Sequence, residues 1–135
     1  MTKPTFTKGK VYFPWNKERV PIPDRKTFFE QRSTRNRNLI TEEEQKVFRN
    51  FRIGIAGLSV GNSVALALTL EGGANHMKLA DFDKLELSYL NRIRAGVQHI
   101  GLNKTILTAQ QIYELNPYAE LELFPKGLLE KNLPA

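Results

Sequence analysis

Two short apolar runs, one ending at a glycine turn and the next ending at aspartates, constrain the fold of this chain most strongly. Residues 53–56 lead into the turn at residues 57–62, and residues 76–80 lead into Asp81 and Asp83. Runs of this length bounded by turn residues are typical of buried strands. The pattern predicts two parallel strands joined through a helix by a right-handed crossover.

The alternation of strand and helix continues toward the C-terminus. Residues 64–70 predict a helix that is apolar on nearly all sides and ends at two glycines, as expected for a helix packed tightly on a sheet. Asn103 can cap a helix with apolar residues at helical spacing over 106–113, which Asn116-Pro117 ends. Residues 121–124 alternate as a third strand. We therefore expect an α/β, Rossmann-like three-layer fold with a parallel sheet, of which this chain holds the first half of a doubly wound domain.

The first 51 residues predict an arm that packs on this domain. Residues 1–24 hold four of the seven prolines, with aromatic residues among them, and predict an extended arm that docks its aromatics. Residues 25–31 predict a short helix. Thr41 and Glu44 form a capping-box signature that begins a helix over residues 42–50. Three residues of this region are expected to face inward: Val47, Phe48 and Phe51.

The net charge of +6 comes entirely from the N-terminal part of the chain. Residues 1–52 hold 13 Lys and Arg against 6 Asp and Glu, whereas residues 53–135 hold 7 against 8. Arg32, Arg35 and Arg37 lie close together in the sequence. Such a cluster is more often a solvated face or a phosphate contact than a nucleic-acid patch, so we expect no nucleic-acid partner.

Several functional classes are excluded by composition. The chain has no cysteine, so it forms no disulfide, thiolate metal site or thioester of its own. His76 and His99 belong to no metal-ligand pattern, and we predict no metal site. No run approaches the roughly 18 apolar residues of a membrane span, and the N-terminus leads into no apolar signal region. We expect a cytoplasmic protein of one domain with no membrane contact.

The glycine turn is the first candidate site. Glycines at such a turn allow the backbone to approach a phosphate, and the following helix N-terminus offers amide hydrogens. The candidate phosphate contacts are Gly57, Ser59, Gly61 and Asn62. Compared with G-x-G-x-x-G, this chain has Ser59 and Asn62 at the later positions, so an ordinary strand-to-helix turn remains an alternative.

Acidic and basic residues downstream strengthen a nucleotide-site interpretation. Asp81 follows a strand 24 residues after Gly57, near the usual spacing of about 20 for the acid that binds ribose hydroxyls. Asp83 is a turn former and a second candidate acid. Arg92 and Lys104 supply two cations, since Arg suits bidentate phosphate contact and Lys acts as a point charge.

These motifs together resemble the ThiF/MoeB and ubiquitin-activating-enzyme family of ATP-dependent adenylating domains. That family has a glycine turn, then D-x-D-x-V-x-x-S-N-L-x-R, then G-x-x-K, then a helix ending in L-N-P. The corresponding elements of this chain are residues 57–62, 81–92, 101–104 and 115–117. Residues 35–40 are more loosely similar to an R-x-x-R-Q segment that precedes the first strand of the family.

The resemblance implies ATP-dependent adenylation of a carboxylate, typically at the C-terminus of a small ubiquitin-like or sulfur-carrier protein. It implies ATP and Mg²⁺ as cofactors, with Asp81 on the ribose and with Arg92 and Lys104 as catalytic phosphate contacts. Arg37 would reach the ATP of a partner subunit. Residues 52–135 would form the ATP-binding domain, and we expect a homodimer or association with the remainder of a longer protein.

Three departures from the family pattern leave alternatives open. Tyr89 stands where the family has asparagine, and Ser59 and Asn62 stand where it has glycines. The aspartate that binds magnesium in the family follows the next strand, which lies beyond Ala135. We therefore expect this chain to be the front portion of an adenylating protein. The alternatives are a non-catalytic nucleotide-binding or interaction module, and an NAD(P)- or FAD-dependent oxidoreductase domain.

Overall fold

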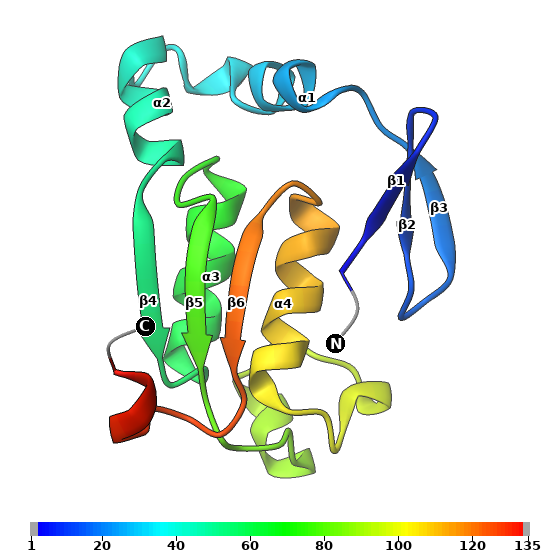
Figure 1. Cartoon of the computed structure of the whole chain (residues 1–135), viewed down its shortest axis with the longest axis vertical. Helices are drawn as coiled ribbons and strands as arrows, with labels where there is room; N and C mark the ends of the chain where they lie inside the picture. Colours follow the sequence, from blue (N-terminus) through cyan, green and yellow to red (C-terminus); the bar gives the residue numbers. More distant parts are fainter. Residues whose placement is uncertain (1–2, 134–135) are drawn as a thin grey trace.

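A parallel three-stranded sheet forms the centre of the computed structural model, which describes residues 3–133 (Figure 1). Strands β4 (Arg52–Ala56), β5 (His76–Ala80) and β6 (Glu120–Phe124) lie in that order. Leu79 of β5 lies opposite Ile55 of β4 and Leu123 of β6. The parallel sheet predicted from the sequence is therefore confirmed.

Two helices cover one face of this sheet, α3 (Val60–Leu70) and α4 (Lys104–Leu115) (Figure 1). The side chains buried between helices and sheet include Ala65, Leu66, Met77, Leu79, Ala109, Ile112 and Tyr113. Gly61 sets the approach of α3, because a Cβ atom there would lie 2.6 Å from Cγ2 of Ile55. The close packing of α3 on β4 depends on this glycine.

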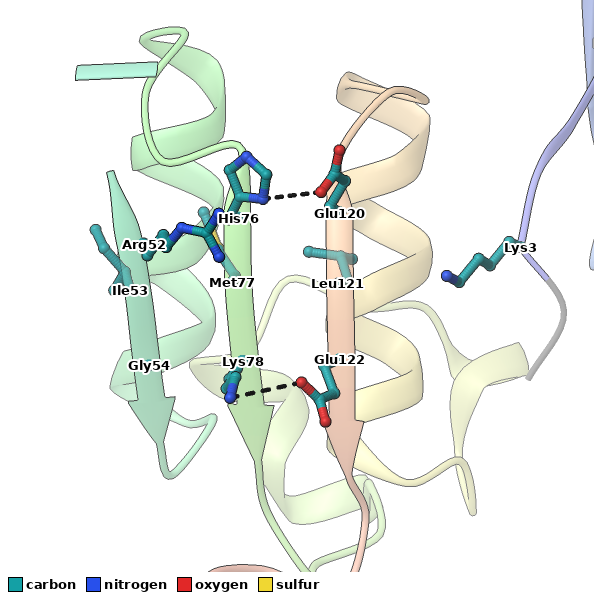
Figure 2. A pocket seen from close by; sticks show the side chains of 10 residues that line it. All are labelled: Lys3, Arg52, Ile53, Gly54, His76, Met77, Lys78, Glu120, Leu121 and Glu122. Carbon is teal, nitrogen blue, oxygen red and sulfur yellow. Dashed lines mark ion pairs between the residues drawn. The ribbon is translucent and has the colours of Figure 1, made fainter. Parts of the chain in front are cut away.

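The opposite face of the sheet is polar near the start of its strands. His76 Nδ1 lies 2.9 Å from Glu120 Oε2, and Lys78 Nζ lies 3.6 Å from Glu122 Oε2 (Figure 2). These cross-strand pairs line a hollow of about 630 Å³. Within residues 3–133 no helix covers this part of the sheet, so the described chain supplies two of the three expected layers.

The N-terminal arm is more ordered than an extended segment. It forms an antiparallel sheet from β1 (Thr5–Thr7), β2 (Lys10–Phe13) and β3 (Glu18–Pro21), which lies beside α4 (Figure 1). Trp15 stacks on Tyr113 with ring centroids 6.2 Å apart, and its Nε1 donates to Glu114 at 2.7 Å. Phe6 stacks on Tyr118 at 4.8 Å. Docking through aromatic side chains is confirmed, whereas the strand pairing was not predicted.

The helices α1 (Arg25–Arg32), η1 (Thr34–Asn36) and α2 (Glu42–Arg49) cross the N-terminal end of the parallel sheet (Figure 1). The capping box of α2 is confirmed, since Thr41 Oγ1 accepts from the Glu44 amide at 3.1 Å. None of the helices that the structure describes has the length and hydropathy needed to cross a membrane.

The inward face of α2 agrees with the prediction at Phe48, which is half-buried and packs against Gly73, and differs from it at two other residues. Val47 is 60% exposed and Phe51 is 49% exposed, while Gln45 is fully buried. The Gln45 amide donates to the carbonyls of Glu71 and Gly72, both at 3.2 Å. A polar side chain therefore ties α2 to the turn after α3, because these carbonyls at the end of α3 need donors.

Candidate functional site

The candidate site lies at the carboxyl ends of β4 and β5, where ligands bind in open α/β sheets. Gly57 has φ of +87°, a conformation that favours glycine, and its amide donates to the Ala80 carbonyl at 2.8 Å. A Cβ atom on Gly57 would point into open space in the described part of the chain. Glycine is therefore favoured at position 57 by the backbone conformation of the turn, and not by a lack of space for a side chain.

The helix that follows the turn presents its N-terminus at the same place. In residues 3–133, no side chain caps the N-terminus of α3, although Ser59 occupies the N-cap position. The first amides of an uncapped helix carry partial positive charge and have no intrahelical acceptor. This end of α3 therefore has amides without a side-chain acceptor, and anion binding at the glycine turn stays a prediction.

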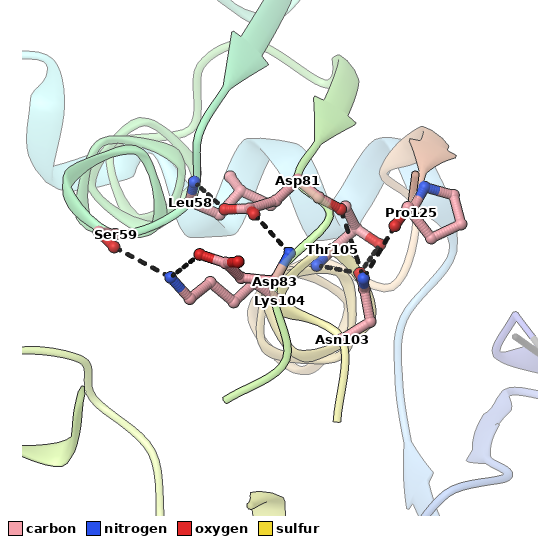
Figure 3. A network of polar contacts seen from close by, with 8 residues as sticks. All are labelled: Leu58, Ser59, Asp81, Asp83, Asn103, Lys104, Thr105 and Pro125. Atoms are coloured by element: carbon pink, nitrogen blue, oxygen red, sulfur yellow. Dashed lines mark hydrogen bonds and ion pairs between the residues drawn. The ribbon is translucent and has the colours of Figure 1, made fainter. Parts of the chain in front are cut away.

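Asp81 holds the glycine turn against the end of β5 (Figure 3). Its Oδ2 accepts from the amide of Leu58 at 2.7 Å, and its Oδ1 accepts from the amide of Asp83 at 2.9 Å. Asp81 is 8% exposed and Leu58 is 1% exposed. A carboxylate has about four acceptor positions, so these two bonds leave acceptor positions on each oxygen.

Lys104 converges on the same turn from the first position of α4. Its Nζ donates to Ser59 Oγ at 3.1 Å and lies 3.5 Å from Asp83 Oδ2 (Figure 3). The lysine side chain is 4% exposed, whereas that of Asp83 is 41% exposed. The ammonium group is therefore held in place by a hydroxyl and a carboxylate at the turn.

Both candidate cations lie against the Tyr89 ring. Lys104 Nζ lies 4.3 Å from the centroid of the Tyr89 ring, and Arg92 Cζ lies 5.1 Å from it. Both distances fall within the range of cation–π attraction. Tyr89 lies in η2 (Leu87–Asn91), and Arg92, exposed, caps its C-terminal end. From the sequence, Tyr89 was noted only as a departure from the family pattern, and its contacts with Lys104 and Arg92 were not predicted.

Asn103 links the ends of β5, β6 and α4. Its Oδ1 caps α4 by accepting from the Thr105 amide at 2.8 Å, as the sequence predicted. Its Nδ2 also donates to the carbonyls of Asp81 at 3.3 Å and Pro125 at 3.0 Å (Figure 3). This second role fixes Lys104 relative to the strand ends, and no local sequence signal indicated it.

Two residues of the predicted glycine-turn site serve packing instead. Asn62 is 1% exposed, and its Nδ2 donates to Thr108 Oγ1 and to Gln111 Oε1, both at 2.8 Å. These bonds use both hydrogens of the amide, so we assign Asn62 to the interface of α3 with α4 rather than to a phosphate. Gly61 likewise packs against Ile55. The sequence analysis placed both at the nucleotide because they lie within the turn at residues 57–62, which was compared with G-x-G-x-x-G.

Arg37 is separated from the other candidate residues. It follows η1 at the N-terminal end of the sheet, whereas the turn and Lys104 lie at the C-terminal end (Figure 1). Its guanidinium donates to Ser33 Oγ at 3.1 Å and to the Ile40 carbonyl at 3.3 Å. Any contact of Arg37 with a nucleotide at this site requires a second copy of the chain.

The described side chains do not fit a metal ion by themselves. Across residues 3–133, no group of three or more His, Cys, Asp or Glu side chains converges as a metal site needs. Asp81 and Asp83 are the two carboxylates at the turn, and both have partners within the chain. The described residues therefore provide no complete set of Mg²⁺ ligands by themselves.

Known proteins are similar to this chain in sequence over much of its length. The ThiF family model matches residues 32–134. The uncharacterized protein MT1398 of Mycobacterium tuberculosis is 46% identical over 118 residues, which cover 87% of this chain and 16% of that protein. Ubiquitin-like modifier-activating enzyme 5 of Arabidopsis thaliana is 33% identical over 80 residues, covering 59% of this chain and 19% of the enzyme.

Solved structures support the same relationship. The E. coli tRNA N6-threonylcarbamoyladenosine dehydratase TcdA, in complex with ATP, matches with a TM-score of 0.69 and 27% identity over 76% of this chain and 43% of its own. E. coli MccB with ATP shares the fold, with a TM-score of 0.58 and 23% identity over 64% of this chain and 26% of MccB. The chain spans less than half the length of each of these relatives. Since the family match covers more than half of its residues, the chain belongs to the ThiF family.

Proposed function

We propose that this chain supplies the nucleotide-binding half of an ATP-dependent adenylating domain. The observation that carries the proposal is the convergence of Lys104 and Arg92 on the Tyr89 ring beside an uncapped helix N-terminus. Two cations and a set of free amides at the end of a strand suit a polyphosphate. The complexes of TcdA with ATP and with AMP support this choice of ligand.

Each candidate residue has a role that its surroundings allow. Asp81 and the more exposed Asp83 accept hydrogen bonds from the ribose hydroxyls, Asp81 through the acceptor positions that Leu58 and Asp83 leave free. Gly57 and Ser59 present the turn to the phosphates. When ATP binds, Lys104 exchanges its contact with Asp83 for a phosphate oxygen. Arg92 is exposed and meets the phosphates without losing a buried contact.

The proposed reaction is the transfer of AMP to a carboxylate of a small carrier protein. A carboxylate oxygen attacks the α-phosphorus, the bond from that phosphorus to the β-phosphate oxygen breaks, and the electron pair leaves with pyrophosphate. Lys104 and Arg92 stabilise the negative charge that grows on the leaving group. Arg37 of a second copy would contribute a further cation, which makes a homodimer part of the proposal.

A second candidate, a nucleotide-binding module without turnover, is favoured by a specific observation. Lys104 is 3% exposed and already bonded to Ser59 and Asp83, so the cation nearest the turn is satisfied without a ligand. Tyr89 also replaces an asparagine of the family pattern. A module of this kind would bind ATP and release it unchanged.

Binding and exchange measurements separate these functions. We expect MgATP to raise the melting temperature of the chain and NAD or FAD to leave it unchanged. Stabilisation by NAD alone would refute adenylation in favour of an oxidoreductase. Incorporation of labelled pyrophosphate into ATP, in the presence of a carrier protein, then tests chemistry. ATP binding without exchange would identify the non-catalytic module.

Two variants connect the result to the site. Lys104→Met removes the buried cation, and Lys126→Met removes a lysine outside the network as a matched control. We expect about tenfold weaker ATP binding for Lys104→Met, the loss typical of one charge-assisted contact. Equal affinities for both variants would contradict the assigned site.

A further inference from the structure

We propose that α1, η1 and α2 form a second anion site, which binds a phosphate-class group at the end of the sheet opposite the nucleotide site. The hollow has a volume of about 400 Å³, and every side chain that lines it is polar. The lining residues are Lys26, Glu30, Ser33, Thr34, Arg37, Glu42, Lys46 and Arg49. The helices α1 and α2 lie at the N-terminal end of the parallel sheet, away from the start of α4, where Lys104 lies (Figure 1).

The charges around the hollow are not balanced within the described chain. Four cations face two carboxylates. The ion pair between Lys26 and Glu30 is long, at 3.9 Å, and both side chains are mostly exposed, so it neutralises little charge. In residues 3–133, no carboxylate oxygen lies within 4.0 Å of Arg37, Lys46 or Arg49. Three cations are therefore left without a partner of opposite charge.

Two of these cations are held in fixed positions. Arg37 donates to Ser33 Oγ and to the Ile40 carbonyl, and Ser33 is itself 3% exposed. The Arg49 guanidinium lies 4.6 Å from the centroid of the buried Phe29 ring. Stacking and hydrogen bonding remove side-chain freedom before any ligand arrives, so less entropy is lost on binding.

The cluster also brings like charges together. Burial lowers the pKa of Arg49, the nearby charges of Arg25 and Arg37 lower it further, and the weaker opposing effects of Glu30 and Glu42 leave it lowered. Repulsion of this kind costs stability in the free chain, and a bound anion would relieve it. The geometry thus suits a ligand with more than one negative charge.

The chemistry of the lining selects phosphate over other anions. Arg37 and Arg49 each offer a planar fork of N–H donors, which fits phosphate oxygens bidentately. Lys46 adds a point charge, and the volume exceeds that of a single phosphate. We assign the hollow to a free anion of this class, such as pyrophosphate, which is distinct from the contact proposed above for Arg37 with a nucleotide on a second copy of the chain.

A pyrophosphate titration of the ¹⁵N-labelled chain, followed by amide NMR shifts at low salt, tests the site. We expect shifts at Ser33, Thr34 and Arg49, which report the hollow independently of the nucleotide site. The variant Lys46→Gln with Arg49→Gln should weaken this binding by at least about tenfold. The control, Arg19→Gln with Arg35→Gln, removes the same charge outside the hollow and should change affinity by less than about twofold.

The outcomes separate the source of the phosphate and test the proposal. Saturable shifts with an unchanged monomer mass identify a free anion as ligand. Dimerisation driven by ATP but not by pyrophosphate, and lost in the Lys46→Gln, Arg49→Gln variant, would overturn the free-anion site, because these cations would then serve a nucleotide on a second copy of the chain. Equal weakening in both double variants would overturn the site, as would shifts confined to the Gly57 turn. The Lys104→Met chain should keep the shifts at Ser33, so failure of the proposed function is distinguishable.

Discussion

Asp81→Asn is expected to destabilise the fold, because this carboxylate bonds to two backbone amides. Its oxygens accept from Leu58 at 2.7 Å and from Asp83 at 2.9 Å. Asparagine offers one oxygen, so one of the two amides must face an NH₂ group instead. The bond to Leu58 is buried, and a hydrogen bond to a charged group contributes about 1.5–3 kcal/mol.

The magnitude follows from the loss of one such bond. We expect Asp81→Asn to lower the free energy of unfolding by about 2 kcal/mol, which is about 8 °C in melting temperature for a chain of this size. Urea denaturation followed by circular dichroism measures the change, with the slope against urea expected to stay constant. The matched control is Asp83→Asn, which keeps a side-chain oxygen near Lys104, removes no acceptor from a backbone amide, and should therefore cost less than Asp81→Asn.

The comparison of the two variants can refute this reasoning. If Asp81→Asn unfolds at the same urea concentration as the wild type but loses ATP affinity, the carboxylate serves the ligand and not the turn. If Asp83→Asn is the less stable variant, the backbone contacts of Asp81 contribute less than their geometry indicates. Both results would require a different account of how the glycine turn is held.

Two further predictions concern the cation pair and the first helix. Tyr89→Leu should weaken ATP binding about 3- to 30-fold with little effect on adenosine binding, because the ring positions Lys104 and Arg92. The control variant Tyr89→Phe keeps the ring and should bind ATP normally. If calorimetry shows that Tyr89→Leu loses affinity for ATP and adenosine equally, the ring does not act through the two cations. The hydrogen bond from the Thr27 hydroxyl is the main cause that lowers the pKa of Asp24 in the folded chain. The stabilisation of α1 by the Asp24 carboxylate is therefore present at pH values above its ordinary pKa of 3.8 and is lost as the pH falls through the lowered pKa of the folded state. Asp24→Ser caps α1 without titrating, so the difference in melting temperature between wild type and variant should change only below pH 3.8; a constant difference would count against this linkage.

Much of the fold could be predicted because its signals are local. Three such signals are the capping box at Thr41, the glycine after β4 and the proline after α4. Each acts on the backbone within a few residues, so it can be recognised without knowledge of tertiary contacts. The N-terminal sheet was missed because its strands have only three or four residues and its pairing depends on packing against α4.

The candidate site was only partly predictable for a related reason. Its chemistry-bearing residue types and their order identified the family, since spacing along the chain is a property of the sequence itself. Several of the contacts that assemble the site join side chains more than 20 residues apart, as with Lys104 and Ser59 or Asn62 and Thr108. No local rule states which of these side chains meet.

The sequence by itself therefore determined the alternation of strands and helices, the glycine turn and the position of the acids and cations along the chain. Only the tertiary structure decided that Asp81 bonds to the backbone, that Asn62 joins two helices, and that the Tyr89 ring gathers Lys104 and Arg92. The periodicity of apolar residues is set within a single helix or strand and can be read from the sequence. Hydrogen-bond and cation–π partners depend instead on which distant segments pack together.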